Sequence, residues 1–326
     1  MPLPPPDWNP QALLEPLRLG WLERAGVEVA MLRLDRIDPL VSGNKWFKLA
    51  PHLQRAVAKD FGGVMTLGGA HSNHLHAVAA AGQRFGFDTV GLLRGDPQDT
   101  PTVADLRRFG MTLHWLGYGG YRARHAPGFW DDWQARYPAL MPVPEGGGGL
   151  SGALGCAPLV AMIQRQLPVL GWADYDALWT AAGTGTTLAG LVLGEAGRHP
   201  VVGALAVPAD HGVAEQVRAL LVEAGAADAG YRLLDASRGG FGRVDAELAC
   251  AMLAWEAEGG IELDPLYTVK ALLALRQQIE AGYLAAGSRI VLLHTGGLQG
   301  RRALSTRLHH LAGYTSTSAD ALEINR

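Results

Sequence analysis

The feature that most constrains this sequence is the alternation of short, β-rich apolar runs with longer segments of helical periodicity. Runs predicted to be strands lie at residues 27–34, 63–67, 89–93, 112–116, 177–181, 201–206 and 290–294. Segments predicted to be helices lie at residues 50–59, 72–85, 101–109, 152–167, 187–196, 212–224, 244–258 and 268–281. Strands separated by helix-length crossovers pair in parallel, so the pattern predicts an α/β fold with open parallel sheets.

The segment at residues 117–150 interrupts this alternation. It is rich in Gly, Pro, Tyr and Trp and ends in a run of four glycines at residues 146–149. Such composition is typical of a connection between units. We therefore expect a large domain made of residues 1–46 and 158–326, a small inserted α/β domain at residues 47–157, and a ligand in the cleft between them.

Composition narrows the partners that the chain is expected to bind. The 326 residues include 48% hydrophobic residues and carry a formal net charge of -3, with Lys and Arg dispersed along the chain. A globular protein without a basic surface is not expected to bind nucleic acid or a membrane. Residues 1–10 hold five prolines and no apolar run. We therefore expect no signal peptide or transmembrane segment, a cytoplasmic location and a small-molecule partner.

Cysteine and histidine positions argue against a disulfide and against a metal site. Cys156 and Cys250 each lie in an apolar helical run, which predicts two buried free thiols in a reducing compartment. His71, His74 and His76 lie close together, but no second set of ligands with metal-binding spacing accompanies them. We therefore expect no metal.

A loop rich in Gly and Thr joins the predicted strand at residues 177–181 to the next helix. Its glycines allow N–H groups to converge on phosphate oxygens, and the helix N-terminus adds partial positive charge. A plain strand-to-helix turn with Thr caps has the same composition. Leu188 stands where a dinucleotide fingerprint requires Gly, so a phosphate on a smaller cofactor is the functional interpretation. The candidate residues are Gly183, Thr184, Gly185, Thr186 and Thr187.

A second loop, Ser-Gly-Asn-Lys at residues 42–45, follows the first predicted strand. Lysine is scarce, with four Lys among 28 Lys and Arg residues. Only Lys can form an imine, so Lys45 in a Gly-containing loop is a candidate for covalent catalysis. Lys48 is the rival imine former, and a solvated surface lysine is the alternative.

A third loop, at residues 68–74, follows the predicted strand at residues 63–67. Ser72 and Asn73 supply a hydroxyl and an amide at a helix N-terminus, where a carboxylate or a ring oxygen can bind. A simple N-cap by Ser72 explains the loop equally well. All three loops follow parallel strands at their carboxyl ends, the edge at which open α/β sheets bind ligands.

Five motifs together resemble the family of 1-aminocyclopropane-1-carboxylate (ACC) deaminase and D-cysteine desulfhydrase. The resemblance runs from about Leu14 to Gly300 and implies the tryptophan synthase β-like fold of pyridoxal 5′-phosphate (PLP) enzymes, fold type II. It also implies a homodimer. The motifs are Ser-Gly-Asn-Lys at 42–45, Gly-Gly-Ala-His-Ser-Asn at 68–73, Gly-Thr-Gly-Thr-Thr at 183–187, Asp-Pro-Leu-Tyr at 264–267 and His-Thr-Gly-Gly at 294–297.

The resemblance implies a role for each candidate residue. Lys45 would hold PLP as a Schiff base and shuttle the α-proton. Asn73 would contact the ring hydroxyl, and the loop at 183–187 would bind the phosphate. Ser72 and Tyr267 would face the substrate.

Two threonines separate the branches of this family. ACC deaminases resemble one another in having Glu and Leu where this chain has Thr268 and Thr295. A carboxylate keeps the ring nitrogen protonated, whereas a Thr hydroxyl gives a weaker electron sink. That sink suffices for a thiolate leaving group, whose parent thiol has a pKa of about 8.5. The pair resembles the desulfhydrase branch, and we expect Thr295 nearest the ring nitrogen, with Thr268 second.

We therefore predict a PLP-dependent lyase that converts D-cysteine to pyruvate, ammonia and hydrogen sulfide. Alternatives are ACC deaminase, a lyase for another small D-amino acid, and an inactive PLP-binding protein. Departures from the family lie at Phe47, where Arg is usual, at His71 and His74, where Gln is common, and at residues 35–38, which lack the usual Arg-Glu-Asp. These differences affect the prediction of the substrate more than the prediction of the cofactor.

Overall fold

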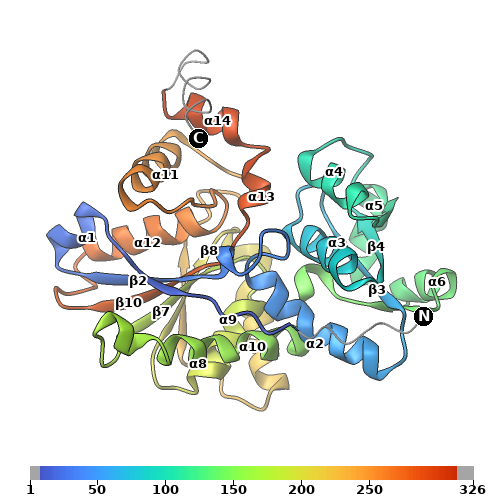
Figure 1. Ribbon diagram of the computed structural model, residues 1–326, viewed down its shortest axis with the longest axis horizontal. Coiled ribbons are helices and arrows are strands. Elements are labelled where there is room, and N and C mark those ends of the chain that lie inside the picture. The colour runs from blue at the N-terminus through green and yellow to red at the C-terminus, as the bar shows by residue number, and fades with distance from the viewer. Residues whose placement is uncertain (1–7, 314–326) are drawn as a thin grey trace.

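The strands form two separate sheets in the computed structural model, which describes residues 8–313 (Figure 1). The larger sheet has six strands in the order β1-β2-β10-β7-β8-β9, and the smaller has four in the order β5-β4-β3-β6. Only β1 and β2 pair antiparallel; the other neighbouring strands of the described residues are parallel. The predicted α/β fold with two open parallel sheets is therefore confirmed. The strands are β1 (Leu14–Leu17), β2 (Glu28–Arg33), β3 (Gly63–Gly68), β4 (Asp88–Leu93), β5 (Thr112–Trp115), β6 (Leu140–Pro142), β7 (Ala177–Ala182), β8 (Val201–Leu205), β9 (Tyr231–Asp235) and β10 (Arg289–His294).

Helices cover both faces of the larger sheet. In Figure 1, α1, α11 and α12 lie on one face, and α8, α9 and α10 lie on the other. The helices are α1 (Gly20–Ala25), α2 (Asn44–Ala58), α3 (Asn73–Phe85), α4 (Pro101–Arg108), α5 (Gly117–Arg122), α6 (Phe129–Arg136), α7 (Gly149–Cys156), α8 (Pro158–Gln164), α9 (Thr186–Glu195), α10 (Val213–Glu223), α11 (Ala246–Gly259), α12 (Thr268–Glu280), α13 (Leu298–Arg301) and α14 (Ser305–Leu311).

The side chains of β2 show why its apolar run is continuous. Val29 and Met31 belong to the core beneath α11 and α12, whereas Ala30 and Leu32 belong to the core on the opposite face. Alternate residues of a strand point to opposite faces, so a strand covered on both sides must be apolar throughout. The same requirement explains why the central strands could be predicted from the sequence.

The segment at residues 152–167, predicted as one helix, forms two helices, α7 and α8. Pro158 begins α8, because its ring fixes a helical φ but it has no N–H to continue the hydrogen bonding of α7. Cys156 is buried as expected, but Cys250 is exposed. The expectation of two buried thiols was therefore wrong for Cys250, since an apolar helical run does not say which side of a helix faces the core.

The two sheets lie within the two units that the sequence predicts, residues 1–46 with 158–326 and residues 47–157. Helix α7, near the end of the smaller unit, packs on α9 of the larger one. A Cβ at Gly190 would lie 2.2 Å from the carbonyl oxygen of Ala153. Because α7 of the smaller unit packs so closely on the larger unit, the domain boundaries stay a prediction. Within residues 8–313, no helix combines the length and apolar character needed to cross a membrane.

Candidate active site

The parallel topology brings three of the five motifs, at residues 42–45, 183–187 and 294–297, to one edge of the larger sheet. Strand β10 lies between β2 and β7, so the loops that follow these three strands are neighbours. Asn44 joins them directly. Its N–H donates to the carbonyl oxygen of Thr295 at 3.2 Å, and its Nδ2 donates to Thr187 Oγ1 at 2.8 Å.

Gly43 permits this close approach. Its φ is +78°, and a Cβ there would lie 2.3 Å from the carbonyl oxygen of Thr295. An L side chain would clash and would also strain the backbone. The turn before Lys45 therefore requires Gly.

Lys45, in the first turn of α2, lies inside the site. Its Nζ donates to Asn44 Oδ1 at 2.9 Å and lies 6.0 Å from the centre of the Tyr267 ring. Burial lowers the pKa of Lys45 to about 8, although the nearby charges of Cys156 and Asp264 oppose the shift. About a tenth of this amine is therefore neutral and nucleophilic at pH 7, far more than for a lysine with the ordinary pKa.

Tyr267 reaches the site from the start of α12. Asp264 holds this turn, because its Oδ1 accepts the N–H groups of Leu266 and Tyr267 at 3.1 and 2.6 Å. Burial raises the pKa of Asp264 to about 7 and holds the pKa of Tyr267 above its ordinary value. The phenol of Tyr267 is therefore protonated at neutral pH.

The Gly- and Thr-rich loop lies beside Tyr267 and opens α9, as predicted. Gly185 precedes the helix with φ +75°, and the hydroxyls of Thr184 and Thr186 lie 3.1 Å apart. A Cβ at Gly183 would lie 3.2 Å from Cε1 of Tyr267. The loop thus presents backbone N–H groups and hydroxyls at a helix N-terminus, which is the arrangement that binds phosphate.

Lys48 also lies in the site, although none of the five motifs includes it. It lies three residues after Lys45 on α2 and is buried. A Cβ at Gly146 would lie 3.8 Å from Lys48 Nζ and 3.9 Å from Thr184 Oγ1, so the ammonium faces the Gly- and Thr-rich loop. Burial, reinforced by the charge of Lys45, lowers the pKa of Lys48 to about 7. Its spacing from Lys45 was the available signal, because residues three apart share a helix face.

Ser72 and Asn73 lie at the start of α3. The hydroxyl of Ser72 caps the helix and accepts the N–H of Leu75 at 3.2 Å. Asn73 Oδ1 accepts a hydrogen bond from Gln299 Nε2 at 2.9 Å. Because its oxygen is engaged, Asn73 keeps its Nδ2 as the donor available to a ligand. Gln299 itself belongs to no motif recognised in the sequence.

The two threonines differ in exposure. Thr295, directly after β10, keeps 8% of its surface exposed. Thr268, the first residue of α12, is fully buried, and its hydroxyl has no hydrogen-bond partner within residues 8–313. The choice of Thr295 as the threonine nearest a bound ring nitrogen, with Thr268 second, stays a prediction.

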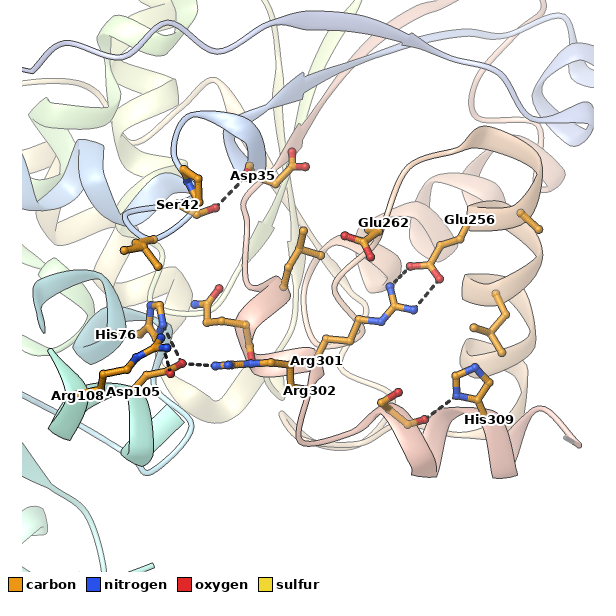
Figure 2. A pocket seen from close by; sticks show the side chains of 17 residues that line it. Asp35, Ser42, His76, Asp105, Arg108, Glu256, Glu262, Arg301, Arg302 and His309 are labelled. Carbon is orange, nitrogen blue, oxygen red and sulfur yellow. Dashed lines mark hydrogen bonds and ion pairs between the residues drawn. The ribbon is translucent and has the colours of Figure 1, made fainter. Parts of the chain in front are cut away.

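A cleft of about 890 Å³ lies beside this site, between the unit that contains the larger sheet and the unit that contains the smaller sheet (Figure 2). Ser42 and Gln299 line it and connect it to the Lys45 loop and to Asn73. Figure 2 shows Arg302 reaching Asp105 of α4 across the cleft. This ion pair links the segment after α13 to the smaller unit. The part of the chain that the structure describes contains no group of three or more His, Cys, Asp and Glu residues that could hold a metal.

Known proteins are similar to this chain over most of its length. Residues 9–296 match the family described as "Pyridoxal-phosphate dependent enzyme". A Pyrococcus horikoshii protein named provisionally as an ACC deaminase is 29% identical over 290 residues, 84% of this chain and 86% of that protein. The D-cysteine desulfhydrase of Klebsiella pneumoniae is 26% identical over 292 residues, 84% and 88% of the two chains. A solved structure of an ACC deaminase homologue has a TM-score of 0.83 at 26% identity, covering 95% of this chain and 96% of the other.

Proposed function

This chain belongs to the pyridoxal-phosphate dependent enzyme family, and on that premise we propose that it is a lyase that eliminates sulfide from D-cysteine. The products are pyruvate, ammonia and hydrogen sulfide. The observation that carries the proposal is the polar but uncharged pair Thr268 and Thr295 beside a site in which Lys45 is largely desolvated.

The phosphate end of the site fits PLP. The loop from Gly183 to Thr187 supplies N–H groups and hydroxyls at the start of α9. Lys48 supplies a buried amine, and a Cβ at Gly146 would lie within 4 Å of both its Nζ and Thr184 Oγ1. Burial lowers the pKa of Lys48 to about 7, and a phosphate beside the amine would favour its charged form.

The ring end of the site fits as well. Lys45 would supply the amine for covalent attachment, Asn73 Nδ2 would donate to the ring hydroxyl, and Thr295 would contact the ring nitrogen. The bound cofactor supplies an electron sink that stabilises negative charge at the substrate α-carbon. A threonine hydroxyl, unlike a carboxylate, leaves the ring nitrogen unprotonated, so the sink is of moderate strength.

The remaining steps belong to side chains of this chain. Ser72 and the N-terminus of α3 bind the substrate carboxylate. Lys45, with its lowered pKa, accepts the proton from the α-carbon. Tyr267 keeps its phenolic proton and positions it near the leaving sulfur.

ACC deamination is the second candidate, because relatives carry that name. Opening an unactivated ring needs a stronger sink than elimination of a thiolate. The buried carboxyl group of Asp264 is engaged by the N–H groups of Leu266 and Tyr267, directly before α12. The threonine pair therefore favours elimination.

We also propose a cytoplasmic homodimer with a small amino-acid substrate. The apolar segment at residues 152–167 buries residues such as Ala153 and Leu159 inside the chain. Leu154 is its large exposed apolar residue at 50% exposure. The dimer interface is therefore not assigned to this segment.

The test is an assay of the PLP-loaded protein with D-cysteine, L-cysteine and ACC, measuring sulfide, pyruvate and 2-oxobutanoate. We expect sulfide and pyruvate in equal amounts from D-cysteine and little product from ACC. Product from ACC alone would replace the proposal with the deaminase. Absence of turnover with all three, with PLP retained, would indicate a binding protein.

A further inference from the structure

Lys270 is a buried lysine that the proposed chemistry does not use. It lies on α12, three residues after Tyr267, and is 1% exposed. Its Nζ donates to four backbone carbonyl oxygens. These belong to Ala206 at 3.2 Å, Ser237 at 3.1 Å, Gly240 at 3.0 Å and Phe241 at 2.9 Å.

This cage has the chemistry of a monovalent cation site. Neutral carbonyl oxygens that replace the hydration shell are how proteins coordinate potassium. An ammonium has three hydrogens, so the four oxygens share them and surround the nitrogen as they would surround a metal ion. Burial lowers the pKa of Lys270 to about 8, although nearby acids, Asp264 first, oppose the shift.

The cage joins three segments that are distant in sequence. Ala206 directly follows β8, residues 237–241 form the connection from β9 towards α11, and Lys270 belongs to α12. Without the ammonium, the carbonyl oxygens of Ala206 and Phe241 would have no donor within the described residues, whereas those of Ser237 and Gly240 would keep the N–H groups of Gly240 and Arg243. Each such unsatisfied group carries a desolvation cost.

Phe241 connects the cage to the candidate site. Its ring meets the ring of Tyr267 edge-on, with centres 5.6 Å apart. Phe241 is 41% exposed although it is a large apolar residue. The carbonyl group of this same residue is the shortest contact of Lys270.

We propose that Lys270 is a built-in monovalent cation that holds residues 237–241 against α12 and thereby positions Phe241 beside Tyr267 as a wall of the substrate site. Lys270 is a positioning residue in this account. The cation role stands on the cage alone, and only the substrate wall rests on the proposed function.

The test compares two variants of the PLP-loaded protein. Lys270→Ala removes three methylene groups and the ammonium, which together equal propylammonium. Lys270→Met removes the charge but keeps most of the volume. Both are expected to lower kcat/KM roughly tenfold or more, because buried acceptors lose their donor.

Rescue separates the two variants. Propylammonium chloride or potassium chloride is expected to restore the thermal midpoint and most of the activity of Lys270→Ala, but not of Lys270→Met, relative to tetramethylammonium chloride at equal ionic strength. Wild-type protein in the same salts controls for reaction of the amine with PLP. If Lys270→Ala has the same thermal midpoint and activity in all three salts, the cation role is wrong.

A double-mutant cycle tests the path through Phe241. If Lys270 acts on the substrate site by placing Phe241, the effects of Phe241→Ala and Lys270→Ala on KM are not additive. Additive effects would overturn the positioning role. The thermal midpoint reports the cation role even if D-cysteine proves not to be the substrate, so failure of the inference and failure of the proposed function are distinguishable.

Discussion

At the scale of single residues, the site depends on two lysines that share a face of α2. Lys45 was identified from its motif, because an imine former in a Gly-containing loop is chemically distinctive. Lys48 could be named as a rival but its role could not be predicted, since its neighbours Thr184 and Gly146 are far away in sequence. The same is true of Gln299 and Lys270, whose partners come from other parts of the chain.

The lowered pKa of Lys45 predicts the pH dependence of cofactor attachment. Only the neutral amine attacks an aldehyde, and burial brings the pKa of Lys45 from 10.5 to about 8. The rate at which PLP attaches to cofactor-free protein should therefore rise with pH, reach half its maximum near pH 8 and level off about one pH unit higher. Stopped-flow absorbance measures this rate. A rate that continues to rise towards pH 10.5 would show that Lys45 is not desolvated.

At the scale of elements, most of the predicted strands are buried on both faces of their sheet, and the partly buried edge strand β5 was predicted as well. The missed strands are short, like β1 and β6, or lie at a sheet edge, like β9, so their apolar signal is weak. The contact between the start of α2 and the larger sheet is made by backbone atoms. No pattern of residue types in the sequence indicates such a contact. Gly43 was visible as a glycine, but its contact with Thr295 was not.

Gly43→Ala tests this join. A Cβ would lie 2.3 Å from the carbonyl oxygen of Thr295 at φ +78°, so the variant should lose about 2–4 kcal/mol in the free energy of unfolding and bind PLP more weakly. Gly119→Ala is the matched control, because nothing lies within 4 Å of its Cβ position and its φ is not left-handed. Urea denaturation followed by circular dichroism measures both. Equal stability of the two variants would contradict this account of the turn.

At the scale of the whole molecule, the site lies where two sheets from separate stretches of chain approach each other. The alternation of strands and helices was enough to predict this architecture, and the family match agrees with it. The sequence could not reveal how the units are held together. Arg302 and Asp105 are 197 residues apart yet form an ion pair across the cleft.

Arg302→Ala should loosen the contact between the units more than it destabilises the fold. Arg302 is 47% exposed and Asp105 keeps Arg108 and His76 as partners, so the free energy of unfolding should change by no more than about 1 kcal/mol. Hydrogen exchange should increase in α4 and α13. Arg107→Ala is the control, because Arg107 pairs with Asp99 within the smaller unit. Identical exchange in both variants would rule out a role for this ion pair between units.

In the proposed enzyme, Lys45 carries the cofactor while Lys48 faces its phosphate. Borohydride reduction of the PLP-loaded protein, followed by peptide mass mapping, tests it directly because reduction fixes the cofactor on the lysine that holds it. We expect the phosphopyridoxyl group on Lys45 in the wild-type protein and in Lys48→Met, with weaker PLP binding in the variant. Labelling of Lys48, or no labelling of either lysine, would contradict it.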